Sequence, residues 1–212
     1  MMKPKLKICG MKVPPNILEV AALQPDYMGF IYYKQSKRYA GELSAGLLRE
    51  LPLNIKKTGV FVDESLSVVA ESVTEFGFSA IQLHGAETVE YCLKLKQTVP
   101  EGTELIKAFG VDEDFDFGRL KAYEEVVDYF LFDTQTPGHG GSGKVFNWSL
   151  LDRYELDKPY FLSGGIGPEH LEDISNIKDK RLYAIDVNSR FELEPGLKQI
   201  DKLNDFKNKL SL

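Results

Sequence analysis

The chain has 212 residues, of which 43% are apolar and 27% charged, with a formal net charge of -6 and a pI near 5.2. Because its lysines are scattered among acidic residues, it lacks the basic surface that nucleic acids require, and no nucleic-acid partner is expected. No secretory core precedes the first strand and no segment reaches the roughly 18 apolar residues of a membrane span, so we expect a cytoplasmic protein without a membrane partner.

Short β-rich runs alternate with amphipathic runs along the whole chain. Strands are predicted at residues 5–9, 27–32, 57–62, 80–84, 104–109, 129–133, 160–163 and 183–187. Helices are predicted at residues 17–23, 44–51, 66–76, 88–98, 115–125, 149–154, 168–177 and 200–210. This order predicts a single (β/α)8 barrel domain, a TIM barrel, over residues 1–212. An open doubly wound sheet is the rival fold, but the first strand lacks the G-x-G-x-x-G turn typical of that fold.

The sixth predicted strand ends in a carboxylate, Asp133. Strand residues alternate between the barrel interior and the helix layer, so Leu131 and Asp133 should face inward, and Asp133 should reach the mouth. The glycine-rich segment 138–143 that follows is interpreted as a mobile lid, with a merely flexible loop as the alternative. Its G-x-x-x-x-G-K spelling is not a P-loop, because Val145 stands where Ser or Thr should hold magnesium.

The first predicted strand directs a thiol to the same mouth. The alternation places Lys7 and Cys9 inward, and a cation two residues away favours a thiolate that can act as a general base. A buried structural cysteine is the alternative for Cys9, and it is the expected state of Cys92 within a helix. Two cysteines are too few for a disulfide framework, which suits a reducing compartment. His84 also faces inward, either near a substrate or as a histidine satisfied at a strand end.

Three loops carry candidate anion-binding groups. Arg38, in the loop after the second strand, is suited to a carboxylate, although a solvated charge is the alternative. The loops after strands seven and eight contain Gly164, Gly165, Asp186, Asn188 and Ser189. Phosphate commonly binds to these two loops in (β/α)8 barrels, and Pro168 is expected to begin a helix whose N-terminus favours an anion. A tight Gly-Gly turn without a ligand is the alternative.

Five segments together resemble phosphoribosylanthranilate isomerase, and they occur in that family's order. They are KICG at 7–10, QLHG at 82–85, FDT with GGSGKVFNW between 132 and 148, LSGGI at 162–166, and DVNSRFE-x-x-PG at 186–196. The resemblance implies a (β/α)8 barrel that catalyses the Amadori rearrangement of N-(5-phosphoribosyl)anthranilate in tryptophan biosynthesis, without a cofactor or a metal. Asn147 and Arg190 depart from the family pattern, which often has Asp and Gly at these positions.

The resemblance also implies roles for individual residues. Asp133 would be the general acid that protonates the ribose ring oxygen, and Cys9 the general base that removes a proton from the adjacent sugar carbon. Arg38 would hold the anthranilate carboxylate. The loops at 164–165 and 188–189 would hold the phosphate, and Lys7 and His84 would complete the substrate site. The alternatives are a histidine-pathway isomerase, which is expected to use two aspartates, indole-glycerol-phosphate synthase, or a phosphosugar-binding barrel without activity. The protein is expected to be a monomer or a homodimer.

Overall fold

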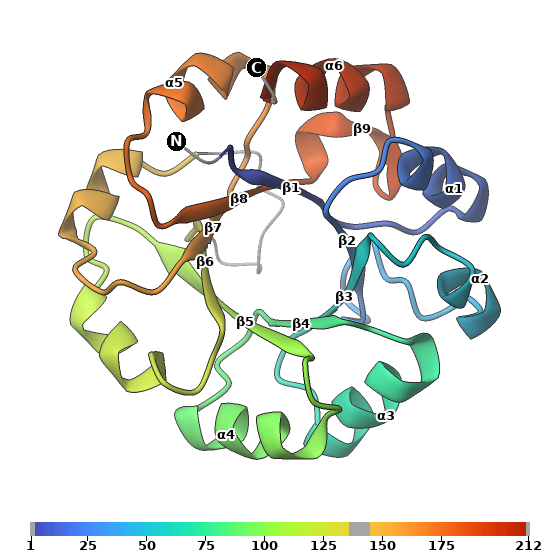
Figure 1. The fold of residues 1–212 in the computed structure, drawn as a ribbon, viewed down its shortest axis with the longest axis horizontal. Helices are drawn as coiled ribbons and strands as arrows, with labels where there is room; N and C mark the ends of the chain where they lie inside the picture. The colour runs from blue at the N-terminus through green and yellow to red at the C-terminus, as the bar shows by residue number, and fades with distance from the viewer. Residues whose placement is uncertain (1–2, 136–144, 211–212) are drawn as a thin grey trace.

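Eight parallel strands close into a barrel in the computed structural model, which describes residues 3–135 and 145–210 (Figure 1). The strands are β1 Lys5–Ile8, β2 Tyr27–Ile31, β3 Lys56–Phe61, β4 Ala80–Leu83, β5 Glu104–Val111, β6 Tyr129–Thr134, β7 Tyr160–Leu162 and β8 Leu182–Val187. Each strand pairs with the next, and β1 pairs with β8, so the sheet has no open edge. The predicted fold class is confirmed, and the predicted strand ends are within two residues of the observed ones.

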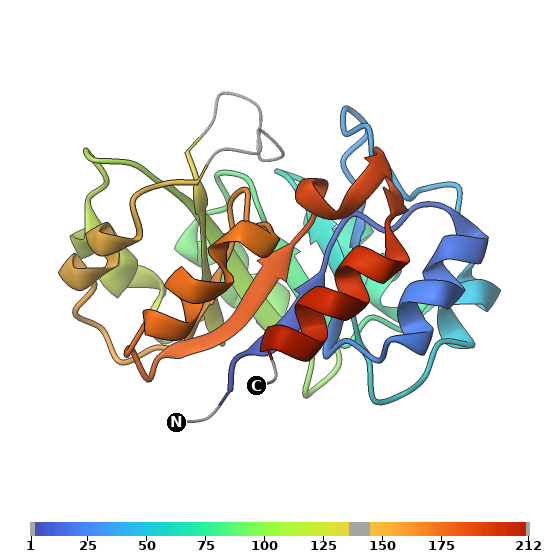
Figure 2. The same ribbon diagram turned by 90° about the horizontal axis from the view of Figure 1, so that it is seen from above.

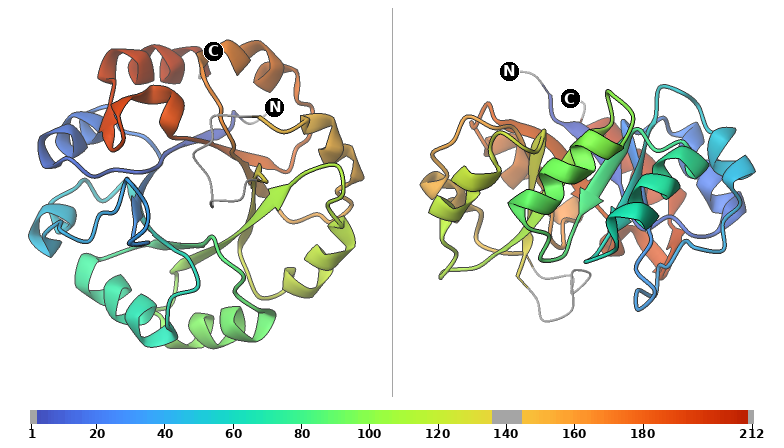
Figure 3. Two further views of the ribbon diagram at one scale, coloured as in Figure 1. Left: turned by 180° about the vertical axis from the view of Figure 1, so that it is seen from behind. Right: turned by 90° about the horizontal axis from the view of Figure 1, so that it is seen from below.

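The helices form a ring outside the strands (Figure 3). They are α1 Pro14–Ala22, α2 Ala45–Arg49, α3 Leu66–Phe76, α4 Val89–Thr98, α5 Leu171–Asn176 and α6 Ile200–Leu210. Helix α1 begins three residues before the predicted start, because prolines are well suited to a first helical turn, where no intrahelical N–H bond is needed. Among the described residues, no helix is both long and apolar enough to cross a membrane.

Two predicted α-helices are 3-10 helices in the structure, namely η1 Phe117–Tyr123 and η2 Trp148–Arg153. The side chains of Asp116 and Asn147 accept hydrogen bonds from the backbone N–H groups two residues later, at Gly118 and Ser149. Such local bonds compete with the α-helical pattern and favour a tight turn. The predicted helix 168–177 is divided into η3 Pro168–His170 and the short helix α5.

A small hairpin after β8 was not predicted from the sequence. The short helix η4 Ser189–Phe191 leads into β9 Glu192–Glu194, which pairs with β10 Leu197–Lys198 in antiparallel fashion. The chain reverses at Gly196, whose φ of 91° lies in the region that favours glycine. These strands are too short for an alternating pattern to reveal them.

The strand alternation predicted from the sequence is confirmed in the packing. Phe130 and Phe132 lie in the core between strands and helices, whereas Leu131 lies inside the barrel. The interior layer consists of Tyr27, Ala80, Ile106, Ala108, Leu131, Phe161 and Ala184. At its lower end, the Tyr27 hydroxyl donates to Glu104 Oε2 over 2.9 Å. Side chains fill the barrel interior at this end, which we call the barrel floor. The functional cavity lies at the opposite end.

The two ends of the barrel differ in what they carry. Strand β1 begins and helix α6 ends on the face opposite the carboxyl ends of the strands (Figure 2). The loops that follow the carboxyl ends of the strands surround the mouth, where reacting groups sit in barrels of this kind.

Candidate active site

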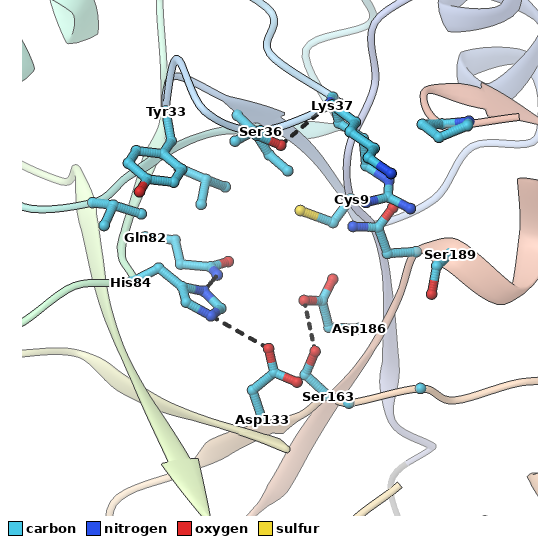
Figure 4. A pocket seen from close by; sticks show the side chains of 18 of the residues that line it. Cys9, Tyr33, Ser36, Lys37, Gln82, His84, Asp133, Ser163, Asp186 and Ser189 are labelled. Carbon is cyan, nitrogen blue, oxygen red and sulfur yellow. Dashed lines mark hydrogen bonds and ion pairs between the residues drawn. The ribbon is translucent and has the colours of Figure 1, made fainter. Parts of the chain in front are cut away.

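A cavity of about 490 Å³ opens at the carboxyl ends of the strands. Nine of the ten predicted site residues line it: Cys9, Arg38, His84, Asp133, Gly164, Gly165, Asp186, Asn188 and Ser189. Cys9 and Asp133 enter the cavity from opposite walls, and His84 and Asp186 lie on either side of Asp133 (Figure 4). The structure therefore gathers almost all of the residues selected from the sequence around one space.

The Cys9 thiol lies immediately after β1 and is buried. The neighbouring strand approaches it closely, since a Cβ atom on Gly29 would lie 2.6 Å from Cys9 Sγ. Burial raises the pKa of the Cys9 thiol above its ordinary value, and the opposing effect of Lys7 does not overcome this increase. Lys7 favours the thiolate, as expected, but burial outweighs its contribution to the pKa of Cys9.

Lys7 lies beneath the cavity and does not line it. Its ammonium Nζ donates to Asp186 Oδ1 over 2.9 Å, and Ser163 Oγ donates to the other carboxylate oxygen over 3.2 Å. Burial acts to lower the pKa of Lys7, but the charges of Asp186 and Cys9 and their hydrogen bonds to Lys7 together outweigh burial and hold this pKa above its ordinary value. In this structure Lys7 thus contacts Asp186, which lines the cavity, and a role of Lys7 at the substrate stays a prediction.

Asp133, near the end of β6, is held by two different donors. Its Oδ1 accepts from the backbone N–H of Thr134 over 2.8 Å, and its Oδ2 lies 3.3 Å from His84 Nε2. The amide nitrogen of Gln82 lies 2.7 Å from His84 Nδ1 (Figure 4). With the amide nitrogen as donor, Nδ1 accepts, and Nε2 is the ring nitrogen that carries a proton toward Asp133. Gln82 was not among the predicted site residues, although it belongs to the QLHG segment.

Arg38 is ion-paired and not solvated. Its Nε and Nη2 donate to the two carboxylate oxygens of Glu192 over 2.9 and 2.6 Å. Glu192 also accepts from Lys198 Nζ over 2.7 Å, and the same ammonium donates to Asn188 Oδ1 over 2.7 Å. Burial works to raise the pKa of Glu192, but its bonds to Arg38 and the charge of Lys198 hold this pKa below its usual value.

Sequence reasoning missed both Glu192 and Lys198. Glu192 belongs to the DVNSRFE segment, so a signal for it was present, whereas Lys198 lies on the hairpin that no pattern indicated.

The loop after β7 has the backbone shape expected for close approach to a ligand. Gly164 and Gly165 have φ values of 92° and 64°, where L side chains are strained. A Cβ atom on Gly164 would lie 2.7 Å from the backbone nitrogen of Thr134. The helix expected to begin at Pro168 is only a three-residue 3-10 turn, so the loop itself provides the backbone N–H groups at this end. The predicted lid, residues 138–143, lies outside the described residues.

The two departures from the family pattern are accommodated locally. The Asn147 side chain accepts from the backbone N–H and the hydroxyl of Ser149, over 3.1 and 2.8 Å, and so caps η2. Arg190 Nη1 lies 3.8 Å from a carboxylate oxygen of Glu169, between the loops that follow β8 and β7.

Comparison with known proteins identifies the family. The family model for N-(5'-phosphoribosyl)anthranilate (PRA) isomerase matches residues 6–209. The chain belongs to the PRA isomerase family. An N-(5'-phosphoribosyl)anthranilate isomerase from Parabacteroides distasonis is 45% identical over 203 residues, which cover 95% of this chain and 90% of the relative.

Solved PRA isomerase structures share the whole fold. The enzyme from Thermotoga maritima has a TM-score of 0.82 at 34% identity, with 98% of both chains covered. A PRA isomerase in complex with reduced 1-(o-carboxyphenylamino)-1-deoxyribulose 5-phosphate has a TM-score of 0.78 at 32% identity, covering 99% of this chain and 100% of that one. Within the part of the chain that the structure describes, no cluster of three or more His, Cys, Asp or Glu side chains is arranged to hold a metal ion.

Proposed function

We propose that the cavity catalyses the Amadori rearrangement of N-(5'-phosphoribosyl)anthranilate in tryptophan biosynthesis, with Asp133 as general acid and Cys9 as general base. The observation that carries this proposal is the entry of a carboxyl group and a thiol into one cavity from opposite walls, at the ends of β6 and β1 (Figure 4). Membership of the PRA isomerase family supports the same reaction.

The two groups act on different atoms of the substrate. Proton transfer from Asp133 to the ribose ring oxygen opens the ring and gives an iminium ion. The Cys9 thiolate then removes a proton from the adjacent sugar carbon, and the resulting enolamine tautomerises to 1-(2-carboxyphenylamino)-1-deoxyribulose 5-phosphate. Groups on opposite walls suit this division, because neither has to move between the two reacting atoms. The Lys7 charge near Cys9 favours the thiolate that the base requires, against the larger and opposing effect of burial.

An assay of the purified protein with freshly made phosphoribosylanthranilate tests the proposal through the change in anthranilate fluorescence. We expect turnover without an added cofactor or metal. Tight binding of the reduced product without any turnover of the substrate would identify a phosphosugar-binding barrel and refute the proposed reaction.

Arg38→Met tests the proposed anthranilate end of the site. Loss of a charge-assisted hydrogen bond should weaken substrate binding by about 1.5–3 kcal/mol, seen mainly in KM. The loss should be much smaller for the aniline analogue that lacks the carboxylate, because that analogue has no charge for the guanidinium to hold. Equal losses on both compounds would show that Arg38 does not recognise the carboxylate.

Gly165→Ala tests the proposed phosphate end. Because Gly165 has a φ of 64°, any side chain is strained there, so Val would confound binding with folding, whereas Ala adds the least bulk. Gly102→Ala is the matched control, since Gly102 has a φ of 85° and no atom within 4 Å of a built Cβ. Both variants should lose roughly 1–2 kcal/mol of stability. Only Gly165→Ala should raise KM and weaken inhibition by inorganic phosphate, and unchanged phosphate inhibition would place the phosphate elsewhere.

We propose that the chain acts as one cytoplasmic domain, as a monomer or a homodimer. Two observations support the single domain and the reducing compartment: the closed barrel spans the described residues from β1 to α6, and both cysteines are buried and unpaired. Size-exclusion chromatography with light scattering would distinguish the monomer from the homodimer.

A further inference from the structure

A buried group of three charges lies behind the wall of the cavity, and it consists of Arg38, Glu192 and Lys198. Only Arg38 lines the cavity, and neither of the other two is among the described residues that do. The side chains of Glu192 and Lys198 are 4% and 0% exposed, so this group is shielded from solvent. Charges of this kind are costly to bury and interact strongly with one another.

Glu192 fixes the orientation of the Arg38 guanidinium. It takes up the Nε–Nη2 edge with both of its carboxylate oxygens, a bidentate arrangement that sets the plane of the guanidinium. Among the described residues, Nη1 has no hydrogen-bond partner, so the second edge is left for a ligand in the cavity. Gly10 leaves room for the same side chain, because a Cβ atom there would lie 2.6 Å from Arg38 Cδ.

Lys198 determines the net charge behind the wall. Arg38 and Glu192 alone sum to zero, so a ligand carboxylate bound to Arg38 would leave an uncompensated negative charge in a buried place. The Lys198 ammonium, 2.7 Å from Glu192 Oε1, changes the sum to +1, which one carboxylate neutralises. Its second bond, to Asn188 Oδ1, connects this charge to the loop after β8.

We propose that Glu192 and Lys198 are positioning residues for carboxylate recognition, acting through Arg38 on the ortho-carboxylate of the substrate. Glu192 orients the guanidinium so that one edge faces the cavity. Lys198 supplies the positive charge that allows the carboxylates of Glu192 and of the substrate to bind the same guanidinium. This inference rests on the proposed function, and specifically on the role of Arg38. According to this inference, Glu192 and Lys198 help to select a substrate whose aromatic amine carries a carboxylate, although neither residue lines the cavity.

A double-mutant cycle of Glu192→Gln and Arg38→Met tests the role of Glu192. Glu192→Gln keeps the shape but places an amide against the guanidinium, so KM for phosphoribosylanthranilate should rise roughly tenfold to a hundredfold, with kcat little changed. In the Arg38→Met background the same change should raise KM no further, because Glu192 then has no guanidinium to orient. A further increase of the same size in that background would overturn the inference.

Lys198→Met tests the charge argument with two substrates. KM should rise for phosphoribosylanthranilate but change little for the analogue that lacks the carboxylate. The double variant Lys198→Met/Glu192→Gln returns the charge sum to +1, so its KM for phosphoribosylanthranilate should be no higher than that of Glu192→Gln alone. Equal increases for both substrates in these folded variants would contradict the proposal.

Glu104→Gln, which removes a carboxylate paired with Lys56 at the barrel floor, controls for the general effect of losing such a group. It should leave both KM values unchanged. Absence of turnover by the parent protein would refute the proposed function itself. If the parent turns over normally but the effects of Glu192→Gln and Arg38→Met on KM simply add, only the role of Glu192 would be refuted.

Discussion

Replacement of Asp133 by Asn is expected to lower kcat by roughly 10²- to 10⁴-fold, the range for loss of a general acid. Asn keeps the size of the side chain and can still accept from the N–H of Thr134, but it cannot supply the proton that opens the ribose ring. The variant should therefore fold normally and bind the reduced product as the parent does. Single-turnover kinetics with phosphoribosylanthranilate would locate the loss in the chemical step.

Asp179→Asn is the matched control for that experiment. Asp179 is another partly buried carboxylate with a nitrogen donor beside it, Arg181, but neither Asp179 nor Arg181 lines the cavity. Its kcat should remain that of the parent. If Asp133→Asn retained more than about a tenth of the parental kcat, ring opening would not depend on this carboxyl group.

Cys9→Ser should reduce kcat by a similar factor, roughly 10²- to 10⁴-fold, because a hydroxyl does not ionise in the range where a thiol does. Cys92→Ser is the matched control, since Cys92 is equally buried and unpaired but lies in α4, away from the cavity. Only the first substitution should affect kcat. Similar kcat values for the two variants would mean that Cys9 is a structural residue.

The pH dependence of the parent offers a second measurement on the same thiol. Burial raises the pKa of Cys9, so the free protein holds mostly the thiol at neutral pH. Because turnover needs the Cys9 thiolate and a protonated Asp133 carboxyl together, kcat/KM should follow a bell-shaped pH profile whose limbs belong to the pair. The stability of the fold should decrease at high pH. A raised pKa in the folded state contributes stability below the unfolded value, and this contribution is lost as the pH rises through the folded value. Both trends should be absent from Cys9→Ser.

Much of the site followed from strand alternation alone. Once residues 129–133 were recognised as a barrel strand, Phe130 and Phe132 had to face the helices and Asp133 the mouth, and the packing confirms this. Cys9 and His84 followed by the same argument. Because the carboxyl ends of all eight strands meet at one mouth, placing each strand was enough to bring distant residues together.

The remaining features depended on contacts that no local pattern encodes. The bond between Arg38 and Glu192 joins residues 154 positions apart, and the Lys198 charge behind it lies on a hairpin too short to predict. The direction of the pKa shift of Cys9 could not be predicted either. Burial of the thiol outweighs the charge of Lys7, and the extent of burial is known only once the fold is known. The 3-10 geometry of η1 and η2 likewise depends on which hydrogen bonds Asp116 and Asn147 make.

The positions at which β1 begins and α6 ends have a practical consequence for attaching other molecules. Because β1 begins and α6 ends on the face opposite the mouth, a tag, surface linker or fused domain at either end is directed away from arriving substrate (Figure 2). An immobilised form of the protein, coupled through either end, would thus present its mouth to the solution. The same geometry allows a second enzyme to be joined in tandem, with each partner keeping its own entrance open.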